Sequence, residues 1–223
     1  MNIIDVKHLK KTYGGAVPNP VLKDINLSIK EGEFVALMGR SGSGKSTLLH
    51  QLGLLDAPTD GEIIIDGVNI LTLSDTEKVA FRLDKLGYVF QSYALLPELT
   101  ALESVSLPLR IAGASKKEYT QKATEMLEKV GLADKIDRLP KEMSGGEQQR
   151  VSIARALVNN PKIVFADEPT ANLDTASSIA VIKLFKQLNK ELQQTIVMVT
   201  HEDDDQKEVN RVIWLKDGFV SDE

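Results

Sequence analysis

The segment GRSGSGKST at residues 39–47 limits what this chain can fold into more than any other stretch. It matches the pattern G-x-x-x-x-G-K-[ST], in which a loop between a strand and a helix turns its backbone N–H groups toward phosphate oxygens. The apolar run EFVALM at 33–38 predicts the short buried strand before the loop. Leu48, Leu52 and Leu55 predict a helix with one buried face after it. A phosphate-binding loop is therefore expected at this point of the chain.

The residue types of this loop suit a chain of phosphates with Mg²⁺. The glycines let the backbone approach the phosphate oxygens closely. Lys45 is expected to reach the β- and γ-phosphates, and the Ser46 hydroxyl is a candidate Mg²⁺ ligand. The N-terminus of the following helix adds a partial positive charge. The candidate nucleotide-binding residues of the loop are Gly39, Arg40, Ser41, Gly42, Ser43, Gly44, Lys45, Ser46 and Thr47.

Buried apolar runs recur later in the chain and alternate with helical patterns. KIVFAD at 162–167 and TIVMVT at 195–200 predict two further buried strands. The amphipathic helix between them is marked by Val181, Phe185, Leu188 and Leu192. Buried strands that alternate with helices indicate a mostly parallel sheet covered on both faces. The predicted fold class is α/β with a P-loop NTPase core.

Three other segments have different patterns. Near the start, Ile25, Leu27 and Ile29 alternate with polar residues, which is typical of a half-buried antiparallel strand. The segment EIIIDGVNI at 62–70 predicts two strand pieces around an Asp-Gly turn, and RVIWLKDGFV at 211–220 predicts a hairpin. We expect antiparallel strands beside the parallel core.

The middle of the chain is mostly helical in pattern. Ser115 and Glu118 fit a capping box at the start of one helix. We expect one domain over residues 1–223. Its expected parts are an antiparallel β subdomain at 1–32 and 60–73, a nucleotide-binding core at 33–59, 74–92 and 159–223, and a helical subdomain at 93–158.

Two adjacent carboxylates end the apolar run IVFADE at residues 163–168. Asp167 would lie beside the phosphate loop and hold Mg²⁺ through water, and Glu168 would act as general base toward the attacking water. A strand that merely ends in two solvated acids is the alternative, but the phosphate loop elsewhere in the chain favours the functional interpretation.

His201 and Gln91 each follow an apolar strand. Strand ends in this architecture gather at the edge of the sheet where ligands bind. There His201 can hydrogen-bond the γ-phosphate and the catalytic water, and Gln91 can meet the metal or the water. A polar residue that merely happens to follow a strand is the alternative, and spacing alone does not decide between the two.

MSGGEQQR at 143–150 admits two interpretations. Ser144 and Glu147 fit a capping box, which would make the stretch an ordinary helix start. Alternatively, the same helix N-terminus is left open toward an anion. A single phosphate loop has no room for a second full cradle, and the residues by themselves leave both interpretations open.

Taken in order, these motifs resemble the nucleotide-binding subunit of ATP-binding cassette (ABC) transporters over essentially the whole chain. The order is an early aromatic residue, the loop, a glutamine, MSGGEQQR, IVFADE, ANLD at 171–174 and a histidine. The stretches at 90–109 and 144–157 look most like the lipoprotein-release and macrolide-export branch.

The resemblance implies ATP and Mg²⁺ as ligands, and it implies roles for particular residues. Tyr13 would stack on adenine, and Gln91 would couple the metal to a membrane partner. Glu168 would activate water, and His201 would orient the γ-phosphate. Asp174 would lie across an interface between two copies of the chain. Those copies would close head-to-tail, so that each completes the ATP site of the other with Ser144, Gly145 and Gly146.

Two residues depart from the usual motif L-S-G-G-Q of that family. Met143 replaces leucine, which is a swap that conserves apolar volume. Glu147 replaces glutamine and brings a carboxylate near a triphosphate, which is tolerable if the carboxylate faces its own helix N-terminus. The branch named above also often has glutamate there.

The net charge and the apolar stretches of the chain indicate which kinds of partner to expect. The net charge of −5 argues against a nucleic-acid ligand, and no apolar stretch has the length of a membrane helix. We therefore expect a cytoplasmic ATPase held at the inner face of the membrane by a separate transmembrane permease. A non-transport ATPase acting in translation or DNA repair, and a module that uses ATP only to dimerise, are the alternatives.

Overall fold

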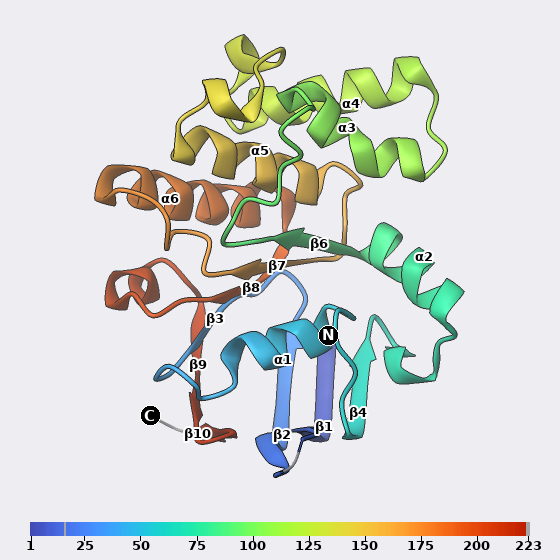
Figure 1. Cartoon of the computed structure of the whole chain (residues 1–223), viewed down its shortest axis with the longest axis vertical. Helices are drawn as coiled ribbons and strands as arrows, with labels where there is room; N and C mark the ends of the chain where they lie inside the picture. The colour runs from blue at the N-terminus through green and yellow to red at the C-terminus, as the bar shows by residue number, and fades with distance from the viewer. Residues whose placement is uncertain (16, 222–223) are drawn as a thin grey trace.

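A six-stranded, mostly parallel sheet runs through the centre of the structure, in the order β10-β9-β3-β8-β7-β6 (Figure 1). The computed structural model describes residues 1–15 and 17–221, so residues 16, 222 and 223, which the predicted domain limits include, lie outside the described residues. Only the outermost pair, β9 with β10, is antiparallel. The strands are β3 (Phe34–Met38), β6 (Leu86–Val89), β7 (Ile163–Asp167), β8 (Thr195–Val199), β9 (Arg211–Lys216) and β10 (Phe219–Ser221).

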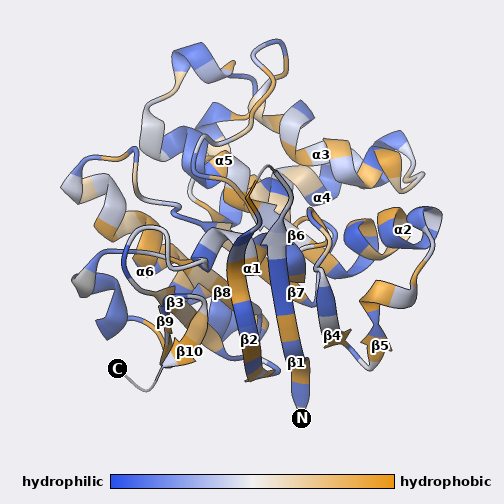
Figure 2. Cartoon of the chain, turned by 60° about the horizontal axis from the view of Figure 1, so that its bottom comes forward, coloured by the Kyte–Doolittle hydropathy of each residue, from blue (hydrophilic) through white to orange (hydrophobic). Residues whose placement is uncertain are grey.

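A second, antiparallel sheet has the order β2-β1-β4-β5. Its strands are β1 (Asn2–Tyr13), β2 (Asn19–Lys30), β4 (Asp60–Ile65) and β5 (Val68–Asn69). Apolar and polar residues alternate along β1 and β2, as Figure 2 shows, because one face of this sheet packs inward and the other meets water.

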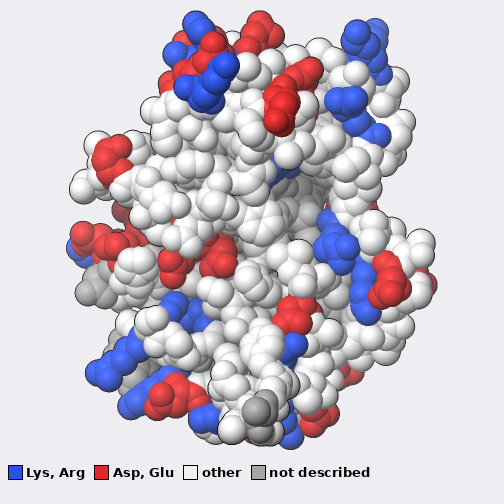
Figure 3. All heavy atoms as spheres, in the orientation of Figure 1, with Lys and Arg blue, Asp and Glu red and all other residues white. Residues whose placement is uncertain are grey.

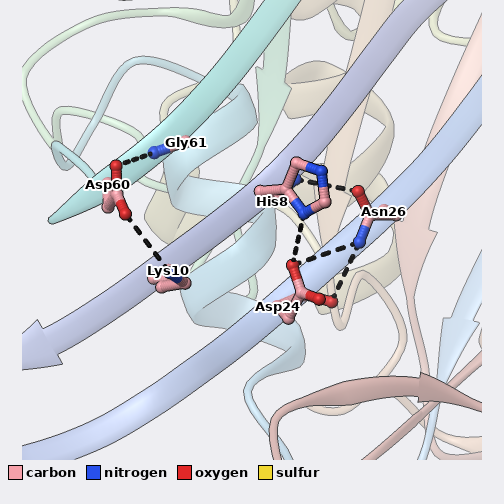
Figure 4. Close-up of polar contacts among 6 residues, drawn as sticks. All are labelled: His8, Lys10, Asp24, Asn26, Asp60 and Gly61. Atoms are coloured by element: carbon pink, nitrogen blue, oxygen red, sulfur yellow. Dashed lines mark hydrogen bonds and ion pairs between the residues drawn. The ribbon is translucent and has the colours of Figure 1, made fainter.

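The outward face of the antiparallel sheet is held by polar pairs across the strands (Figure 4). His8 has a left-handed backbone, with φ of 50°, at an irregularity in the β1 pairing. Its backbone N–H donates to Asn26, and its ring Nδ1 lies 3.0 Å from an Asp24 carboxylate oxygen. Lys10 similarly donates to Asp60 on β4. These pairs connect β1 to both of its neighbours.

Six α-helices in the described part of the chain surround the sheets. Their bounds are α1 (Lys45–Leu52), α2 (Asp75–Lys85), α3 (Ala101–Ile111), α4 (Lys116–Lys129), α5 (Gly145–Leu157) and α6 (Thr175–Leu192). Short 3-10 turns are η1 (Ile70–Thr72), η2 (Ala133–Lys135), η3 (Pro140–Glu142) and η4 (Asp203–Lys207). Among the described residues, no helix combines the length and the apolar character needed to cross a bilayer.

The parallel sheet separates two hydrophobic cores. Successive residues of β7 face opposite sides, so that Val164 joins one core and Phe165 the other. The first core lies under α3, α4, α5 and α6, and the second lies between α1, the parallel sheet and the antiparallel sheet. Figure 1 shows α1 on one side of β7 and β8, and α5 and α6 on the other. Helices α1 and α5 therefore cover opposite faces of the sheet.

The α/β fold class and its mostly parallel sheet are confirmed, as are the antiparallel strands and the hairpin at 211–220. The division of the chain into three parts stays a prediction. The prediction that Leu55 lies on the buried face of the helix after the loop is wrong. Leu55 lies beyond the end of α1 and is 46% exposed, because Gly53 ends the helix and Leu54 takes a left-handed backbone.

Two further details differ from the expectation. The side chain of Ser115 caps α4, but Glu118 pairs with Lys122 instead of completing the capping box. Helix α2, for which no element was predicted, begins with a complete capping box formed by Ser74 and Glu77.

Candidate functional site

The loop 39–47 joins β3 to α1 and has the backbone that its glycines permit. Gly42 and Gly44 have φ of 78° and 104°, and Gly44 is the N-cap of α1. A Cβ atom at Gly44 would come within 2.8 Å of the Leu22 side chain, and one at Gly39 would lie 2.1 Å from the Leu215 carbonyl oxygen. No side chain caps α1, so its first N–H groups remain directed into the loop. The loop therefore has the form of an open anion cradle.

Lys45 and Ser43 place polar atoms in this cradle. Lys45 is only 7% exposed, and its ammonium donates to the carbonyl oxygens of Gly39 and Arg40 at 2.9 and 3.2 Å. The hydroxyl of Ser43 is buried and has no hydrogen-bond partner among the described residues. A buried hydroxyl without a partner is uncommon in folded proteins, and a phosphate oxygen in the cradle would supply one.

Ser46 and Asp167 form the pair that suits Mg²⁺. The Ser46 hydroxyl donates to an Asp167 carboxylate oxygen at 3.0 Å, and the other Asp167 oxygen lies 3.3 Å from His50 Nε2. A hydroxyl and a carboxylate supply the hard oxygen atoms that Mg²⁺ prefers. Both residues therefore fit the expected ion, with Ser46 as a ligand and Asp167 beside it.

Glu168 and His201 lie together at the mouth of the sheet. His201 Nδ1 is 3.8 Å from a Glu168 carboxylate oxygen, and His201 Nε2 is 3.2 Å from Glu202. Glu168 has a left-handed backbone with φ of 44°, and its N–H bonds to the Val199 carbonyl at the end of β8. Both side chains line the same cleft as the loop. A strained backbone at a carboxylate in a cleft is typical of a functional position.

This cleft has a volume of about 1050 Å³, and part of its wall comes from residues that the sequence did not indicate. Lys23 from β2 lines it, together with the turn residues Asp217 and Gly218 between β9 and β10. The N–H of Lys23 bonds to the Gly218 carbonyl at 2.9 Å, and a Cβ at Gly218 would lie 2.5 Å from the Val21 carbonyl oxygen. The sequence predicted the hairpin at 211–220 but not its place in the cleft, because only the meeting of β2 with that hairpin brings these residues here.

Tyr13 lies on β1, beside the cleft and not among the residues that line it. Its register partner on β2, Asn19, does line the cleft. The Tyr13 hydroxyl donates to Asp56 at 2.9 Å, and the Lys11 ammonium lies 4.6 Å from the centre of the ring. The role of Tyr13 in stacking on adenine stays a prediction, with one face of the ring already covered by Lys11.

Gln91 follows β6 and is not among the residues that line the cleft. Its carbonyl accepts a hydrogen bond from Asn172, and the loop after it contains a left-handed turn at Tyr93 and Ala94. The guanidinium of Arg155 in α5 donates to the carbonyl oxygens of both turn residues. The proposed contact between Gln91 and the metal stays a prediction.

Ser144, Gly145 and Gly146 stand at the N-terminus of α5, away from the cleft of their own chain. The sequence left two interpretations of this stretch, a capping box or a helix end open to an anion. The structure contains the capping box. The Ser144 Oγ accepts from the Glu147 N–H at 3.3 Å, and the Glu147 carboxylate accepts from the Ser144 N–H at 2.8 Å. None of Ser144, Gly145 and Gly146 is among the residues that line the cleft of their own chain.

Neighbouring side chains leave little room for a side chain at Gly145 or Gly146. A Cβ at Gly145 would lie 2.9 Å from the Tyr93 hydroxyl, and one at Gly146 would lie 3.0 Å from Ser177 Oγ. Asp174 is the N-cap of α6 and accepts from both the N–H and the hydroxyl of Ser177. These hydrogen bonds lower the pKa of the Asp174 carboxyl. Its role at an interface between two copies stays a prediction.

Residues 22–171 match the protein-family model described as ABC transporter. The chain is 48% identical to the lipoprotein-releasing system ATP-binding protein LolD of Aquifex aeolicus, over 98% of this chain and 96% of that protein. It is also 48% identical to the macrolide export ATP-binding/permease protein MacB of Rhodopirellula baltica, over 99% of this chain. The chain spans about a third of the length of the MacB relatives, with 33% and 32% covered in two of them.

A solved structure with the same architecture is that of the cassette MJ0796, a protein of Methanocaldococcus jannaschii, in a dimeric post-hydrolysis state bound to ADP and Pi. The TM-score is 0.89 at 46% sequence identity, over 98% of this chain and 96% of that chain. An identity of this size over both full lengths makes the likeness one of family as well as of fold.

Proposed function

Because the chain belongs to the ABC transporter family of ATPases, which bind ATP with Mg²⁺, we propose that it powers a separate membrane-embedded transporter through ATP-driven dimerisation. One observation carries this proposal. The cleft gathers Lys45, Glu168 and Ser46 with its partner Asp167, whereas Ser144 is not among the residues that line it. Each chain thus has a nearly complete ATP site and a separate, outward-facing helix end that a second copy would use.

Within the cleft, this chain's residues would bind and hydrolyse ATP. The loop N–H groups and Lys45 would hold the β- and γ-phosphates. Ser46 and Asp167 would hold Mg²⁺, which neutralises phosphate charge when it is bound. The Glu168 carboxylate would take a proton from water as the water oxygen bonds to the γ-phosphorus and the bond to the β-phosphate oxygen breaks. His201, whose Nδ1 lies 3.8 Å from Glu168, would orient the γ-phosphate.

The second copy would complete the site from the other side. In a head-to-tail pair, Ser144, Gly145 and Gly146 of one chain would face the γ-phosphate held by the other. The first-turn N–H groups of Gly145 and Gly146 have no acceptor within α5, which suits an anion. Asp174, at the neighbouring start of α6, would lie at the same interface.

A groove between α2 and α3 would receive the membrane partner. It has a volume of about 410 Å³, lies next to the loop after Gln91, and opens on the face shown in Figure 3. Val79 and Ile111, which are 53% and 65% exposed, both line this groove, so it presents apolar side chains to a partner. We assign the groove to a cytoplasmic segment of a transmembrane permease, which would keep the ATPase at the inner face of the membrane.

Glu168→Gln tests the proposed function. The amide keeps the size of the side chain but does not accept a proton, so we expect hydrolysis to stop while ATP still binds. A stable dimer should then accumulate with ATP and Mg²⁺ in gel filtration. In the same background, Ser144→Arg should leave the chain monomeric with unchanged nucleotide affinity. A Glu168→Gln protein that stays monomeric at saturating ATP would refute head-to-tail dimerisation.

Val79→Asp and Ile111→Asp test the membrane partner. Both substitutions place a charge on the groove rim and leave the cleft untouched. We expect the ATPase to be lost from the membrane fraction of cells that also produce the permease, with ATP binding by the isolated chain unchanged. Recovery from membranes equal to that of the unaltered chain would contradict this docking surface.

A further inference from the structure

Glu147 turns its carboxylate toward its own helix. One oxygen accepts the Ser144 N–H at 2.8 Å, and the Glu147 N–H donates to the Ser144 hydroxyl at 3.3 Å. The side chain is only 22% exposed. The carboxylate that replaces the usual amide is therefore bound to the backbone of its own chain.

Lys135 is the second partner of this carboxylate. Its ammonium lies 3.8 Å from the other Glu147 oxygen and 3.9 Å from Asp134. Lys135 ends the 3-10 turn η2, where its N–H bonds to the Leu132 carbonyl, so its position is set outside α5. The Ser144 hydrogen bond, with the charges of Lys135 and Arg150, lowers the pKa of the Glu147 carboxyl. Glu147 is accordingly ionised at neutral pH, and Lys135 is its cation from a separate segment.

The direction of this carboxylate matters for the neighbouring N–H groups. The capping box occupies the N–H groups of Ser144 and Glu147 and leaves those of Gly145 and Gly146 for an outside anion. A carboxylate released from the box would be free to turn toward that anion. Two negative groups repel strongly at close range in a partly buried setting. The binding of a phosphate at this end of α5 thus requires Glu147 to stay in its box.

We propose that Lys135 is a positioning residue for the phosphate-binding end of α5: its ammonium holds the Glu147 carboxylate against Ser144 and offsets its charge. The inference rests on the proposed function, because the phosphate concerned is that of ATP bound to a second copy. It assigns a role to a lysine outside every motif of the sequence. It also explains how a glutamate is compatible with this position.

The test uses Glu168→Gln protein, in which dimerisation can be measured without hydrolysis. Lys135→Met removes the charge and keeps the length of the side chain. Lys141→Met is the matched control, since Lys141 is an exposed lysine in η3, between α4 and α5. The measurement is the ATP concentration for half-maximal dimer formation by light scattering. Nucleotide affinity of the monomer and thermal melting are measured in parallel.

We expect Lys135→Met to raise that ATP concentration about fivefold, the upper end for a partly exposed ion pair. Adding Glu147→Gln should restore the original value, because the amide needs no cation. Lys141→Met should have no effect, and monomer affinity should be unchanged throughout. Lys135→Arg should retain most of the function.

Two outcomes would overturn the inference alone: a Lys135→Met protein that dimerises like the Lys141→Met control, or a defect that Glu147→Gln does not rescue. The second outcome would mean that Lys135 acts only through the stability of η2, and melting would report that loss. Failure of the Glu168→Gln protein itself to dimerise with ATP would overturn the proposed function as well, so the two failures are distinguishable.

Discussion

The Ser46 hydroxyl donates a hydrogen bond to the Asp167 carboxylate across 3.0 Å, although the two residues are 121 positions apart in the chain. Ser46 lies in the first turn of α1 and Asp167 ends β7, so the bond joins the phosphate loop to the parallel sheet. The His50 ring holds the second oxygen of the same carboxylate. Protein contacts therefore already hold Asp167 beside the phosphate loop.

Asp167→Asn should weaken Mg²⁺ binding, because the amide has no negative charge for the ion or its water ligands. We expect the Mg²⁺ concentration for half-maximal ATPase activity to rise about 10- to 100-fold. Asp137→Asn, the same substitution at an exposed aspartate, is the control and should leave the Mg²⁺ dependence unchanged. An unchanged Mg²⁺ dependence in Asp167→Asn would contradict the assignment.

Leu52→Ala and Leu55→Ala should differ sharply, although the sequence pattern places both leucines in one helical stripe. Leu52 is fully buried and Leu55 is 46% exposed. We expect Leu52→Ala to lower the free energy of unfolding by about 2–5 kcal/mol. Leu55→Ala should change it by less than about 0.5 kcal/mol. Urea denaturation measures both, and equal losses would mean that α1 extends further than described.

Arg155→Met should destabilise the turn after Gln91, because the Tyr93 and Ala94 carbonyl oxygens would lose their charged donor. We expect a loss of about 2–3 kcal/mol in the free energy of unfolding. Arg138→Met, at an exposed arginine, is the matched substitution and should have little effect. Equal stability of the two variants in urea denaturation would show that the Arg155 contacts contribute nothing net.

Asp205→Asn should stabilise the protein at neutral pH. Burial, with the nearby charges of Glu202 and Asp204, raises the pKa of the Asp205 carboxyl in the folded state, while a hydrogen bond from Thr200 opposes the shift. A raised pKa means that stability present below the unfolded pKa is lost as pH rises through the folded pKa.

The amide that replaces the Asp205 carboxylate can still accept from Thr200 through its oxygen, and it carries no charge. Melting temperatures should therefore favour Asp205→Asn at pH 7, with the difference shrinking as pH falls toward about 4, the range of an unperturbed aspartate. Asp137→Asn, at an exposed aspartate, is the matched substitution. A lower melting temperature for Asp205→Asn at pH 7 would mean that the Thr200 hydrogen bond outweighs the cost of burial.

Much of the fold could be predicted because its signals are local. The runs at 33–38 and 195–200 have the fully buried composition of parallel strands, and both form strands of the central sheet. The glycines of the loop mark a backbone that other residues adopt only with strain. The prediction for Leu55 was wrong because the spacing of the leucines continues past the end of α1, which Gly53 and Leu54 set.

Parts of the candidate site could not be predicted because they depend on contacts between distant strands. Lys23 and Gly218 meet only where β2 touches the last hairpin, and neither belongs to a motif. The sequence also left the capping box of Ser144 and an open anion site as alternatives. They are compatible, because the box and the anion use different N–H groups of the same helix turn.

The wall of the cleft comes from both ends of the chain: residues 19–23 meet the turn at 217–218. The phosphate loop itself packs on β9, where Gly39 approaches the Leu215 carbonyl. During synthesis, the loop emerges long before the strand that supports it and the turn that encloses it. A nascent chain stopped before residue 211 would contain every phosphate-binding residue of the loop without the surface that shapes it. Comparing nucleotide binding by the full chain and by a chain stopped before residue 211 would therefore measure how much the final hairpin contributes to the shape of the loop.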